Sequence, residues 1–441
     1  MKESEIITLY KKGDKFNCLN YRPINLLNHV YKLLMQIIYN RIKNTLYESI
    51  PDTQSAYQPN RGTTEQIQSL QQIIEKSKEF NTNGFVCFVD YKKAFDSVDQ
   101  NKLWKALRDH TNLEIPYINL IINAHLDSFS KIKTDCGLTK LIELLKGLKQ
   151  GDILSAILFC VVLSIILYKA FNNQEVGIQV AGRKLSDLGY ADDLAILAMT
   201  LEQLRSMMKR LSDVSNTFGL HINFEKTKIM PIGPHAISYP LTEVDILGQT
   251  MEVVHVFEYL GRKLSNRGDD SIEVKNRVCR AWQAFQDQKS KITHTAISMR
   301  TKRQIVETYI IPCLLYASET IAWTKPNLEK IRVFENHMMR WMTGKKLEEH
   351  VQISELKELT RLPSITQKIK RKKLVWFGHV KRSSAPVKQI TEGFFPGQRT
   401  RGRPAWRWID DIYSWSGKTL HELNTLTKNR AEWRKFCYDL S

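Results

Sequence analysis

GYADDLAILA, residues 189–198, has two adjacent acids before an apolar run. Asp192 and Asp193 stand where a buried strand would begin, and an unpaired charge is costly at such a place. A hairpin turn that leaves both side chains in water explains the pair without any function. A metal site explains it equally well, because carboxylate oxygens are the ligands of hard divalent cations. A second acid in a matching setting would favour the metal site.

Asp90 is such an acid. It ends FVCFVD, residues 85–90, a short run with the aromatic and β-branched residues typical of a strand. Two neighbouring strands of one sheet would bring Asp90 and the two adjacent acids to the same pair of ions, which activate an attacking oxygen and stabilise a leaving one. Taken alone, Asp90 is equally well explained as a helix N-cap, because a helical pattern begins soon after it.

The charge balance points to a polyanionic partner. The chain of 441 residues has 65 Lys and Arg against 46 Asp and Glu, a net charge of +19, which indicates binding to nucleic acid or to an anionic membrane surface. Seven cysteines are scattered singly, so we expect neither a zinc knuckle nor a disulfide framework. No apolar signal-peptide core follows the first residues, and we expect a protein that is not secreted.

One segment is apolar enough to raise the question of a membrane. Residues 153–168, ILSAILFCVVLSIILY, fall short of the roughly 18 to 20 apolar residues that a spanning helix needs. We therefore expect a buried core helix and no membrane partner.

The order of patterns along the chain predicts a mixed α and β protein. Strand and helix signals alternate over about 180 residues from residue 84, and helical spacing dominates from about residue 270 onward. Residues 361–407 carry thirteen Lys or Arg and one acid, with Trp and Phe interleaved. A charge run alone is usually a solvated face, but basic residues mixed with aromatic ones suit phosphate contact and base stacking, so we expect nucleic-acid contact here.

The residues around both acidic sites resemble a known family. FVDYKKAFDSVD, residues 88–99, and YADD, residues 190–193, resemble the two metal-binding motifs of reverse transcriptases, specifically those of non-LTR (LINE-type, RTE-like) retrotransposons. A tetrapeptide alone is weak evidence. Five further segments resemble the family's other motifs and stand in the family's order: 19–42, 53–67, 147–159, 218–230 and 257–261. With segments such as LVWFGHVKR near the C-terminus, the resemblance runs from residue 6 to the end.

The resemblance implies a fold class and an activity. We expect an α+β right-hand polymerase with fingers at residues 1–84, a palm with a small antiparallel sheet at 85–265, a helical thumb at 266–345 and a basic nucleic-acid-binding region at 346–441. The implied reaction adds deoxynucleotides to a primer 3′ hydroxyl and copies RNA into DNA, with two Mg²⁺ ions or with Mn²⁺ in their place. Positioning and charge neutralisation dominate such phosphoryl transfer.

Matching residue to residue assigns the catalytic roles. Asp90, Asp192 and Asp193 match the metal-binding carboxylates, of which Asp90 and Asp192 bridge the ions and Asp193 supports the metal at the primer end less directly. Lys226 matches the lysine that donates a proton to departing pyrophosphate, a role that an ammonium near phosphate can fill. Without the resemblance, Lys226 would be interpreted as an ordinary surface lysine.

The nucleotide-binding residues follow from the same matching. Phe95 matches the aromatic side chain that crowds the sugar 2′ carbon and excludes ribonucleotides, although helical spacing alone would also suit a core residue. Gln150 and Gly151 match the turn along the nascent base pair, where glycine lets the backbone approach the substrate. The remaining matches are the finger cations that hold the triphosphate and the aromatic residue before the double acid: Arg22, Lys32, Arg61 and Tyr190.

In the basic C-terminal region we select nine candidate contacts to nucleic acid. They are Arg371, Lys372, Lys373, Trp376, Lys381, Arg382, Arg399, Arg401 and Arg403. Two departures from the family pattern stand out. Ala156 occupies the place where the family usually has proline, and the chain opens almost at the finger motifs, so we expect no preceding endonuclease. A truncated copy, a gene fragment and one part of a longer polyprotein all remain open.

The implied partners are an RNA template, a DNA primer or nicked target DNA, and dNTPs, at a nuclear site or in a cytoplasmic ribonucleoprotein. The sequence indicates no oligomeric state. An RNA-dependent RNA polymerase shares the palm, but Phe95 and the YADD form disfavour it, and the relative use of dNTPs and rNTPs decides. A non-catalytic nucleic-acid-binding remnant of a retroelement is the other alternative, and metal-dependent primer extension separates it from an enzyme.

Overall fold

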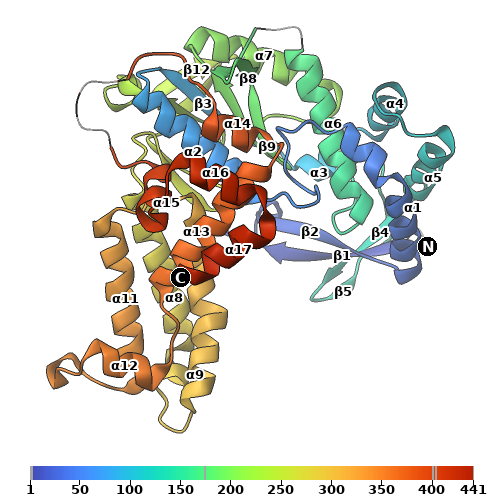
Figure 1. Ribbon diagram of the computed structural model, residues 1–441. Coiled ribbons are helices and arrows are strands. Elements are labelled where there is room, and N and C mark those ends of the chain that lie inside the picture. Colours follow the sequence, from blue (N-terminus) through green and yellow to red (C-terminus); the bar gives the residue numbers. More distant parts are fainter. Residues whose placement is uncertain (1–2, 173–174, 400–401, 403–404, 441) are drawn as a thin grey trace. The chain divides into compact units, whose positions relative to one another are not determined.

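A computed structural model describes residues 3–172, 175–399, 402 and 405–440 (Figure 1). By their internal contacts, the residues form two units. The first consists of Met1–Gln66, Asn83–Pro231 and Tyr239–Val254. The second consists of Ile67–Thr82, Ile232–Ser238 and His255–Ser441. The contacts divide the chain at residue 255 and group residues 67–82 with the C-terminal part. This division into two units does not test the four expected domains, which remain predictions.

The first unit is built on a six-stranded sheet with the strand order β12-β13-β11-β3-β10-β9. Its strands are β3 (Gly84–Val89), β9 (Asp187–Tyr190), β10 (Asp193–Ala198), β11 (Lys228–Ile232), β12 (Glu243–Ile246) and β13 (Gln249–Val253). β10 runs antiparallel to both β3 and β9, whereas β11 and β13 pair in parallel. The sheet is thus mixed in direction, and its antiparallel part contains the strands that carry the acids.

Two helices belong to the core of this unit. α7 (Leu201–Thr217) packs on the sheet and begins after Thr200, whose side chain accepts a hydrogen bond from the Gln203 N–H. α6 (Ile153–Phe171) packs against α7. It is long and apolar enough to cross a membrane, but 78% of its most apolar 18-residue stretch is buried inside the protein. α6 is therefore a buried core helix, as the sequence predicts.

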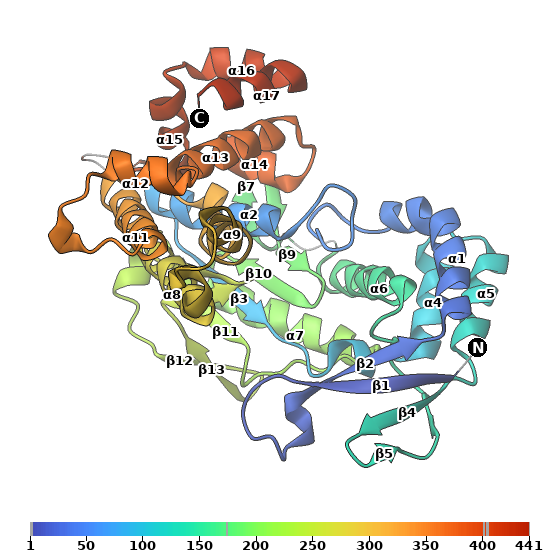
Figure 2. The same cartoon turned by 90° about the horizontal axis from the view of Figure 1, so that it is seen from below.

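A second sheet in the first unit carries the N-terminal ribbon. β1 (Glu3–Tyr10) and β2 (Tyr21–Leu27) form the antiparallel ribbon that Figure 2 shows clearly, and β1 also pairs in parallel with β4 (Phe129–Thr134). β4 pairs in turn with β5 (Gly137–Leu138) and β6 (Ile142–Glu143). Other elements of the unit are α1 (His29–Glu48), α3 (Ala94–Ser97), α4 (Gln100–His110), α5 (Ile115–His125), β7 (Ile178–Val180) and β8 (Arg183–Leu185).

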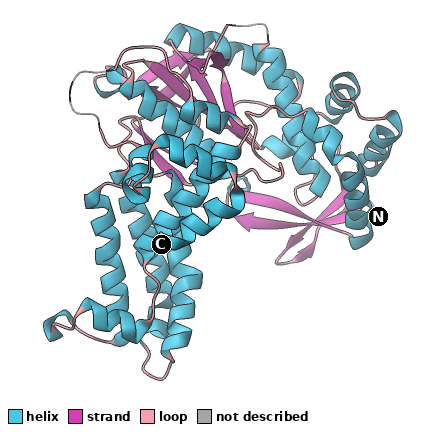
Figure 3. Cartoon of the chain, viewed as in Figure 1, coloured by secondary structure: helices cyan, strands magenta, loops and turns pink. Residues whose placement is uncertain are grey.

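The second unit is mainly helical (Figure 3). Its helices are most of α2 (Thr63–Glu79), α8 (Ser271–Thr293), α9 (Met299–Ile305), α10 (Ile311–Leu315), α11 (Lys325–Thr343), α12 (Ile353–Thr360), α13 (Ile365–Arg382), α14 (Pro386–Glu392), α15 (Trp408–Ser416), α16 (Leu420–Lys428) and α17 (Arg430–Asp439). A hairpin of β14 (Val256–Tyr259) and β15 (Arg262–Ser265) precedes α8. A π-helical turn, Val306–Ile310, joins α9 to α10 shortly before Pro312, which has no N–H to donate.

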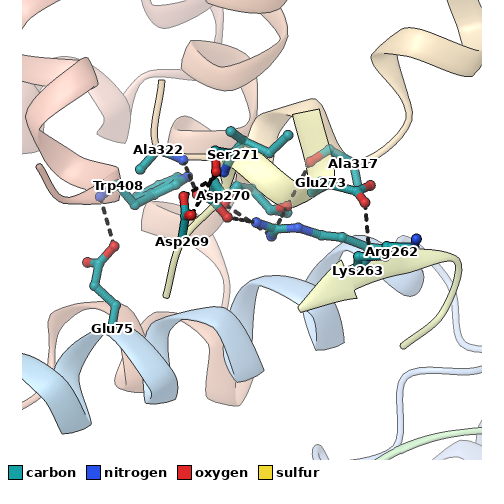
Figure 4. Close-up of polar contacts among 12 residues, drawn as sticks. Glu75, Arg262, Lys263, Asp269, Asp270, Ser271, Glu273, Ala317, Ala322 and Trp408 are labelled. Carbon is teal, nitrogen blue, oxygen red and sulfur yellow. Dashed lines mark hydrogen bonds and ion pairs between the residues drawn. The ribbon is translucent and has the colours of Figure 1, made fainter. Parts of the chain in front are cut away.

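Buried ion pairs cross-link the second unit. Arg262 pairs with Asp270, and the other oxygen of Asp270 accepts a hydrogen bond from the Ala322 N–H at 2.6 Å (Figure 4). Arg277 pairs with Glu273 one turn earlier on α8. All four charged side chains are less than a tenth exposed. Each charge has a partner of opposite sign, which such burial requires.

A second group of buried charges connects α13 with α15 and α2. Lys373 pairs with Asp411, and the same Asp411 oxygen accepts a hydrogen bond from the Trp323 N–H at 2.7 Å. Glu75 on α2 accepts from the Trp408 N–H at 2.9 Å (Figure 4). Burial raises the pKa of Glu75 to about 7, although the hydrogen bond from Trp408 opposes the shift. The helical C-terminal region is therefore fixed by charges as well as by its apolar core.

Candidate active site

The two adjacent acids lie in a tight turn between two strands. β9 ends at Tyr190 and β10 begins at Asp193, and these two residues pair across the hairpin. Ala191 and Asp192 are the central residues of the turn, and Ala191 has a φ of 53°. This left-handed conformation costs a residue other than glycine about 1 to 2 kcal/mol. The hairpin turn that both interpretations of the sequence assume is therefore present. Its backbone is strained at Ala191.

β3 brings the third acid to this turn. Leu194 pairs with Val89, so that the register places Asp193 beside Asp90 at the same end of two neighbouring strands. The pKa of Asp193 is raised to about 6, first by desolvation among protein atoms and then by the charges of Asp192 and Asp90. Desolvation and the charge of Asp192 also raise the pKa of Asp90. The three carboxylates therefore share one electrostatic environment, and we call them the acidic cluster.

Water reaches the acidic cluster. Asp193 is exposed and Asp192 is half-buried, while the Asp90 side chain is 44% exposed. Like charges gathered in an accessible place attract cations, because a cation would relieve the repulsion. The cluster is open to a solvated ligand, in contrast to the buried ion pairs of the second unit.

The segment before β11 holds Asp90. The Asn223 side chain donates to Asp90 Oδ2 at 3.2 Å, and the Asn223 backbone N–H donates to the Asp90 carbonyl at 2.7 Å. Lys226 Nζ lies 4.0 Å from the same Asp90 oxygen and is 71% exposed, so that this ion pair contributes little to stability. Both side chains lower the pKa of Asp90 and favour its charged form. Lys226 thus lies beside the acidic cluster, and its role as a proton donor stays a prediction.

Two cations of the N-terminal ribbon act electrostatically on the acidic cluster. The charge of Arg22, in β2, lowers the pKa of Asp193, and that of Lys11 lowers the pKa of Asp90. Lys11 belongs to no motif and was not among the expected site residues. Tyr10 pairs with Tyr21 in the ribbon, so Lys11 and Arg22 lie at the same end of it. Finding Lys11 would have required the register of this ribbon.

The predicted nucleotide turn packs against the backbone of β2. Gln150 donates from its side chain to Asp96 Oδ1 at 3.2 Å, and its carbonyl accepts from the Asn25 N–H at 2.8 Å. Gly151 has a φ of 119°, and a Cβ there would lie 2.7 Å from the Asn25 carbonyl oxygen. The structure thus shows one reason for glycine here, a close approach of the chain to itself, and the approach of this turn to the substrate stays a prediction.

The two predicted aromatic contacts differ in setting. Phe95 is half-buried and stacks on Phe159 of α6 with ring centroids 4.5 Å apart. It therefore has a core contact, and exclusion of ribonucleotides by its remaining surface stays a prediction. Tyr190 is half-buried at the end of β9, directly before the acidic turn.

Two predicted finger cations do not join the acidic cluster. Arg61 is only 11% exposed in its side chain and pairs with Glu65 at 2.7 Å. It also donates to the Asp52 carbonyl at 2.7 Å and to the Gln54 carbonyl at 3.3 Å. We therefore withdraw Arg61 as a triphosphate contact, because its donors are used within its own loop. Lys32 is exposed on α1 and is not among the charges that shift the pKa of Asp90 or Asp193.

The structure also removes one residue from the basic C-terminal candidates. The Lys373 side chain has no exposed surface and is paired with Asp411, so it reaches no phosphate while the unit is folded. The prediction for Lys373 was wrong. A lysine in a charge run of the sequence looks like its neighbours, and its burial depends on an acid that lies 38 residues further along the chain.

Other predicted basic contacts have partners within the second unit. Lys372 pairs with Glu319 at 2.8 Å, and Lys381 pairs with Glu392 at 2.5 Å. Arg399 pairs with Glu79 but remains 64% exposed. The remaining described candidates also have contacts within the unit. Arg371 lies over the Tyr438 ring, Trp376 stacks on His379, and Arg382 donates to the Thr427 carbonyl. Arg401 and Arg403 lie outside the described residues. Nucleic-acid binding by this region stays a prediction.

The acidic cluster fits divalent cations by its chemistry. Carboxylate oxygens are the ligands that Mg²⁺ requires, and the cluster supplies them from two neighbouring strands. Across residues 3–172, 175–399, 402 and 405–440, no group of three or more His, Cys, Asp or Glu side chains is arranged closely enough to hold an ion. The donor set and the raised pKa values therefore support a cation site, whereas the present side-chain positions are not those of a completed one.

Comparison with known proteins gives a family and several relatives. The profile of the family described as reverse transcriptase (RNA-dependent DNA polymerase) matches residues 10–264, which include the whole acidic cluster. A putative uncharacterized transposon-derived protein of Caenorhabditis elegans is 24% identical over 275 residues, which are 58% of this chain and 96% of that protein.

Two further relatives are retrotransposon proteins by name. The retrovirus-related Pol polyprotein from type-1 retrotransposable element R2 of Popillia japonica is 24% identical and covers 72% of this chain. The RNA-directed DNA polymerase from mobile element jockey of Drosophila funebris is 25% identical and covers 77%. The chain spans only 44% and 37% of these two proteins. Among solved structures, apo telomerase from Candida tropicalis covers 89% of this chain and 70% of that chain, with a TM-score of 0.44 and 13% identity, a likeness too distant to add to the family match.

Proposed function

The chain belongs to the reverse transcriptase family, and on that premise we propose that it is the RNA-directed DNA polymerase of a non-LTR retrotransposon, which extends a primer 3′ hydroxyl with dNTPs. The observation that carries the proposal is the acidic cluster. Asp90 and Asp192 come from strand ends about 100 residues apart in sequence, and their charges act together on Asp193. Such a cluster is costly to the fold and suits a site that binds cationic or metal-neutralised ligands.

Asp90 and Asp192 would hold two divalent cations, Mg²⁺ or Mn²⁺, with Asp193 beside them, and such ions activate the attacking hydroxyl and neutralise the charge on the phosphates. Asn223 orients Asp90 through two hydrogen bonds, one to its side chain and one to its carbonyl. This support keeps the carboxylate fixed while substrates exchange.

The cations around the acidic cluster would have two roles, binding of the triphosphate and proton transfer. Arg22 and Lys11 act electrostatically on the cluster from the ribbon, where an incoming triphosphate would bring negative charge to be balanced. Lys226 Nζ lies 4.0 Å from Asp90 and is exposed, and as an ammonium it would transfer a proton to the pyrophosphate oxygen when the bond to the α-phosphorus breaks. Phe95 would limit space at the sugar 2′ position.

We also propose the partners and the place of action. An RNA template and a DNA primer or nicked target DNA suit the net charge of +19, because both are polyanions. Use of nicked chromosomal DNA would place the reaction in the nucleus, with a cytoplasmic ribonucleoprotein as an earlier stage.

The test is primer extension on a primed RNA template with Mg²⁺, in parallel with dNTPs and with rNTPs. The native protein should extend with dNTPs, and Asp192→Asn should not, while both bind the primed RNA equally in a gel-shift measurement. Extension with rNTPs alone would indicate an RNA polymerase. Binding without extension by the native protein would indicate an inert nucleic-acid-binding remnant and would contradict the proposed function.

A further inference from the structure

One buried side chain holds the strained residue of the acidic turn. Gln54 is 1% exposed and lies in the loop before α2. Its Oε1 accepts a hydrogen bond from the Ala191 N–H at 2.9 Å, and its Nε2 donates to the Ala191 carbonyl at 3.3 Å. The single amide thus satisfies both backbone polar groups of the residue with positive φ.

The backbone on either side of Gln54 reinforces this contact. The Ser55 N–H donates to the Gly189 carbonyl at 3.0 Å, and the Gly189 N–H donates to the Thr53 carbonyl at 2.9 Å. The Gln66 side chain also donates to the Gly189 carbonyl, at 3.0 Å. A Cβ on residue 189 would lie 2.9 Å from Gln54 Nε2, so glycine at this position leaves room for the Gln54 amide.

The loop that carries Gln54 is itself fixed. Arg61 donates to the Gln54 carbonyl and to the Asp52 carbonyl, and it pairs with Glu65 at the start of α2. The Gln58 side chain donates to the Gln54 carbonyl at 2.7 Å. Arg61 therefore supports the site indirectly, because it cross-links the loop that carries Gln54.

From these contacts we propose that Gln54 is a positioning residue, which holds Ala191 in its left-handed conformation and so sets the direction of Asp192. The proposal rests on the proposed polymerase function and adds a residue that touches neither nucleotide nor primer. The amide places a donor and an acceptor on two separate atoms without adding a charge, which matches the carbonyl and the N–H of one residue. A glutamate here would add a negative charge beside the acidic cluster, and a lysine or arginine would have no acceptor for the Ala191 N–H.

This role predicts a particular kinetic signature. Because Gln54 is buried, its loss leaves the surfaces that bind dNTP and primed RNA in place. The loss should misplace Asp192 at the chemical step, and small displacements of a reacting group lower the rate strongly. The effect should therefore fall on kcat and not on KM.

The experiment measures single-nucleotide addition by the full chain on primed RNA, as a function of dNTP concentration, for the native protein and three variants. Gln54→Met keeps the length of the side chain and removes both hydrogen bonds to Ala191, together with the one that Gln54 Oε1 accepts from the Ala56 N–H at 3.1 Å. Gln54→Glu keeps the acceptor and loses the donor. Gln203→Met is the matched control, because the Gln203 amide accepts from the Met199 N–H at 2.8 Å, away from the acidic turn. Thermal unfolding of each variant is recorded beside the kinetics.

We expect Gln54→Met and Gln54→Glu to lower kcat at least about 30-fold with KM for dNTP within about threefold of the native value. Gln203→Met should lose a comparable amount of thermal stability and keep kcat within about twofold. If Gln54→Met does not fold, Gln54→Glu decides alone. A native kcat in the Gln54 variants, or a loss confined to KM, overturns the proposal. An inactive native protein would instead contradict the polymerase function and remove the basis of this inference with it.

Discussion

The protein contains two groups of charged side chains that are built in opposite ways. In the second unit, Arg262 with Asp270 and Lys373 with Asp411 are buried, and each charge has an opposite partner in direct contact. In the acidic cluster of the first unit, water reaches the carboxylates, and their nearest cation, Lys226, stands 4.0 Å from Asp90. The first arrangement stabilises a fold, and the second leaves charge to be balanced by a ligand.

The two groups show how a charge that stabilises the fold differs from a charge that binds a ligand. Burial and pairing, not residue type or local density of charge, distinguish the two groups. Burial lowers the pKa of Lys373 while Asp411 opposes the shift, so that the pair holds its charges within the fold. In the acidic cluster, neighbouring like charges add to desolvation in raising the pKa of Asp193.

The largest effect should follow from neutralising an acid of the cluster. Asp90→Asn should lower the rate of primer extension by about 10³-fold or more, equivalent to about 4 kcal/mol in the activation barrier. Asp96→Asn is the control, because Asp96 lies six residues further on and contacts Gln150. It should lower the rate less than about tenfold. Equal losses in the two variants would show that the acids act through general charge and not through the cluster.

The next effect is on stability. Lys373→Met should lower the free energy of unfolding by about 3 to 5 kcal/mol, because it leaves Asp411 buried and unpaired. The double variant Lys373→Met with Asp411→Leu should recover much of this loss. Lys372→Met, which removes the pair between the 39% exposed Lys372 side chain and the buried Glu319, should cost less than Lys373→Met, because water reaches one partner of this pair. Urea unfolding measures all three, and equal costs for Lys372 and Lys373 would deny the contrast.

A smaller effect separates two arginines that look alike in the sequence. Arg22→Ala should raise KM for dNTP about tenfold, because Arg22 acts electrostatically on the acidic cluster and is exposed. Arg61→Ala should instead lower the melting temperature, since Arg61 cross-links its own loop. Steady-state kinetics and thermal unfolding are measured on both variants. A rise in KM for Arg61→Ala without loss of stability would restore it as a triphosphate contact.

The smallest effect concerns pH. Burial raises the pKa of Glu75 from its ordinary value of 4.5 to about 7 in the folded protein. Between these values the folded chain keeps a proton that the unfolded chain has released, so stability falls as the pH rises through this window. Glu75→Gln should therefore be more stable than the native protein at pH 8, by about 1 to 2 kcal/mol, and equal to it at pH 4.5. A constant difference between the two pH values would contradict the assignment to Glu75.

Much of the acidic site could be predicted from the sequence, because its chemistry resides in local patterns. The runs before Asp90 and after Asp193 have the composition of buried strands, and the structure contains β3 and β10 there. The apolar run 153–168 was correctly interpreted as a core helix, and the burial of α6 inside the protein, not its length, is what shows this. Such features depend on composition and spacing within a few residues of the chain.

What could not be predicted depends on contacts between distant residues. Gln54 reaches Ala191 across 137 residues, and no residue type signals that contact. Lys11 required the ribbon register, and Lys373 required a partner in α15. Gly151 was selected correctly for close approach, but the approaching atom is the Asn25 carbonyl. Residues are thus easier to predict than their partners, and the partner decides between a structural and a functional role.

We expect that the acidic cluster lowers the free energy of unfolding and is required for primer extension. Two measurements on Asp192→Asn test both statements together. Primer extension on primed RNA and urea unfolding are measured on the native protein and on this variant. Removing one of three like charges should abolish extension while the free energy of unfolding stays equal or rises. Retained extension, or a fold that becomes less stable when the charge is removed, would contradict the claim.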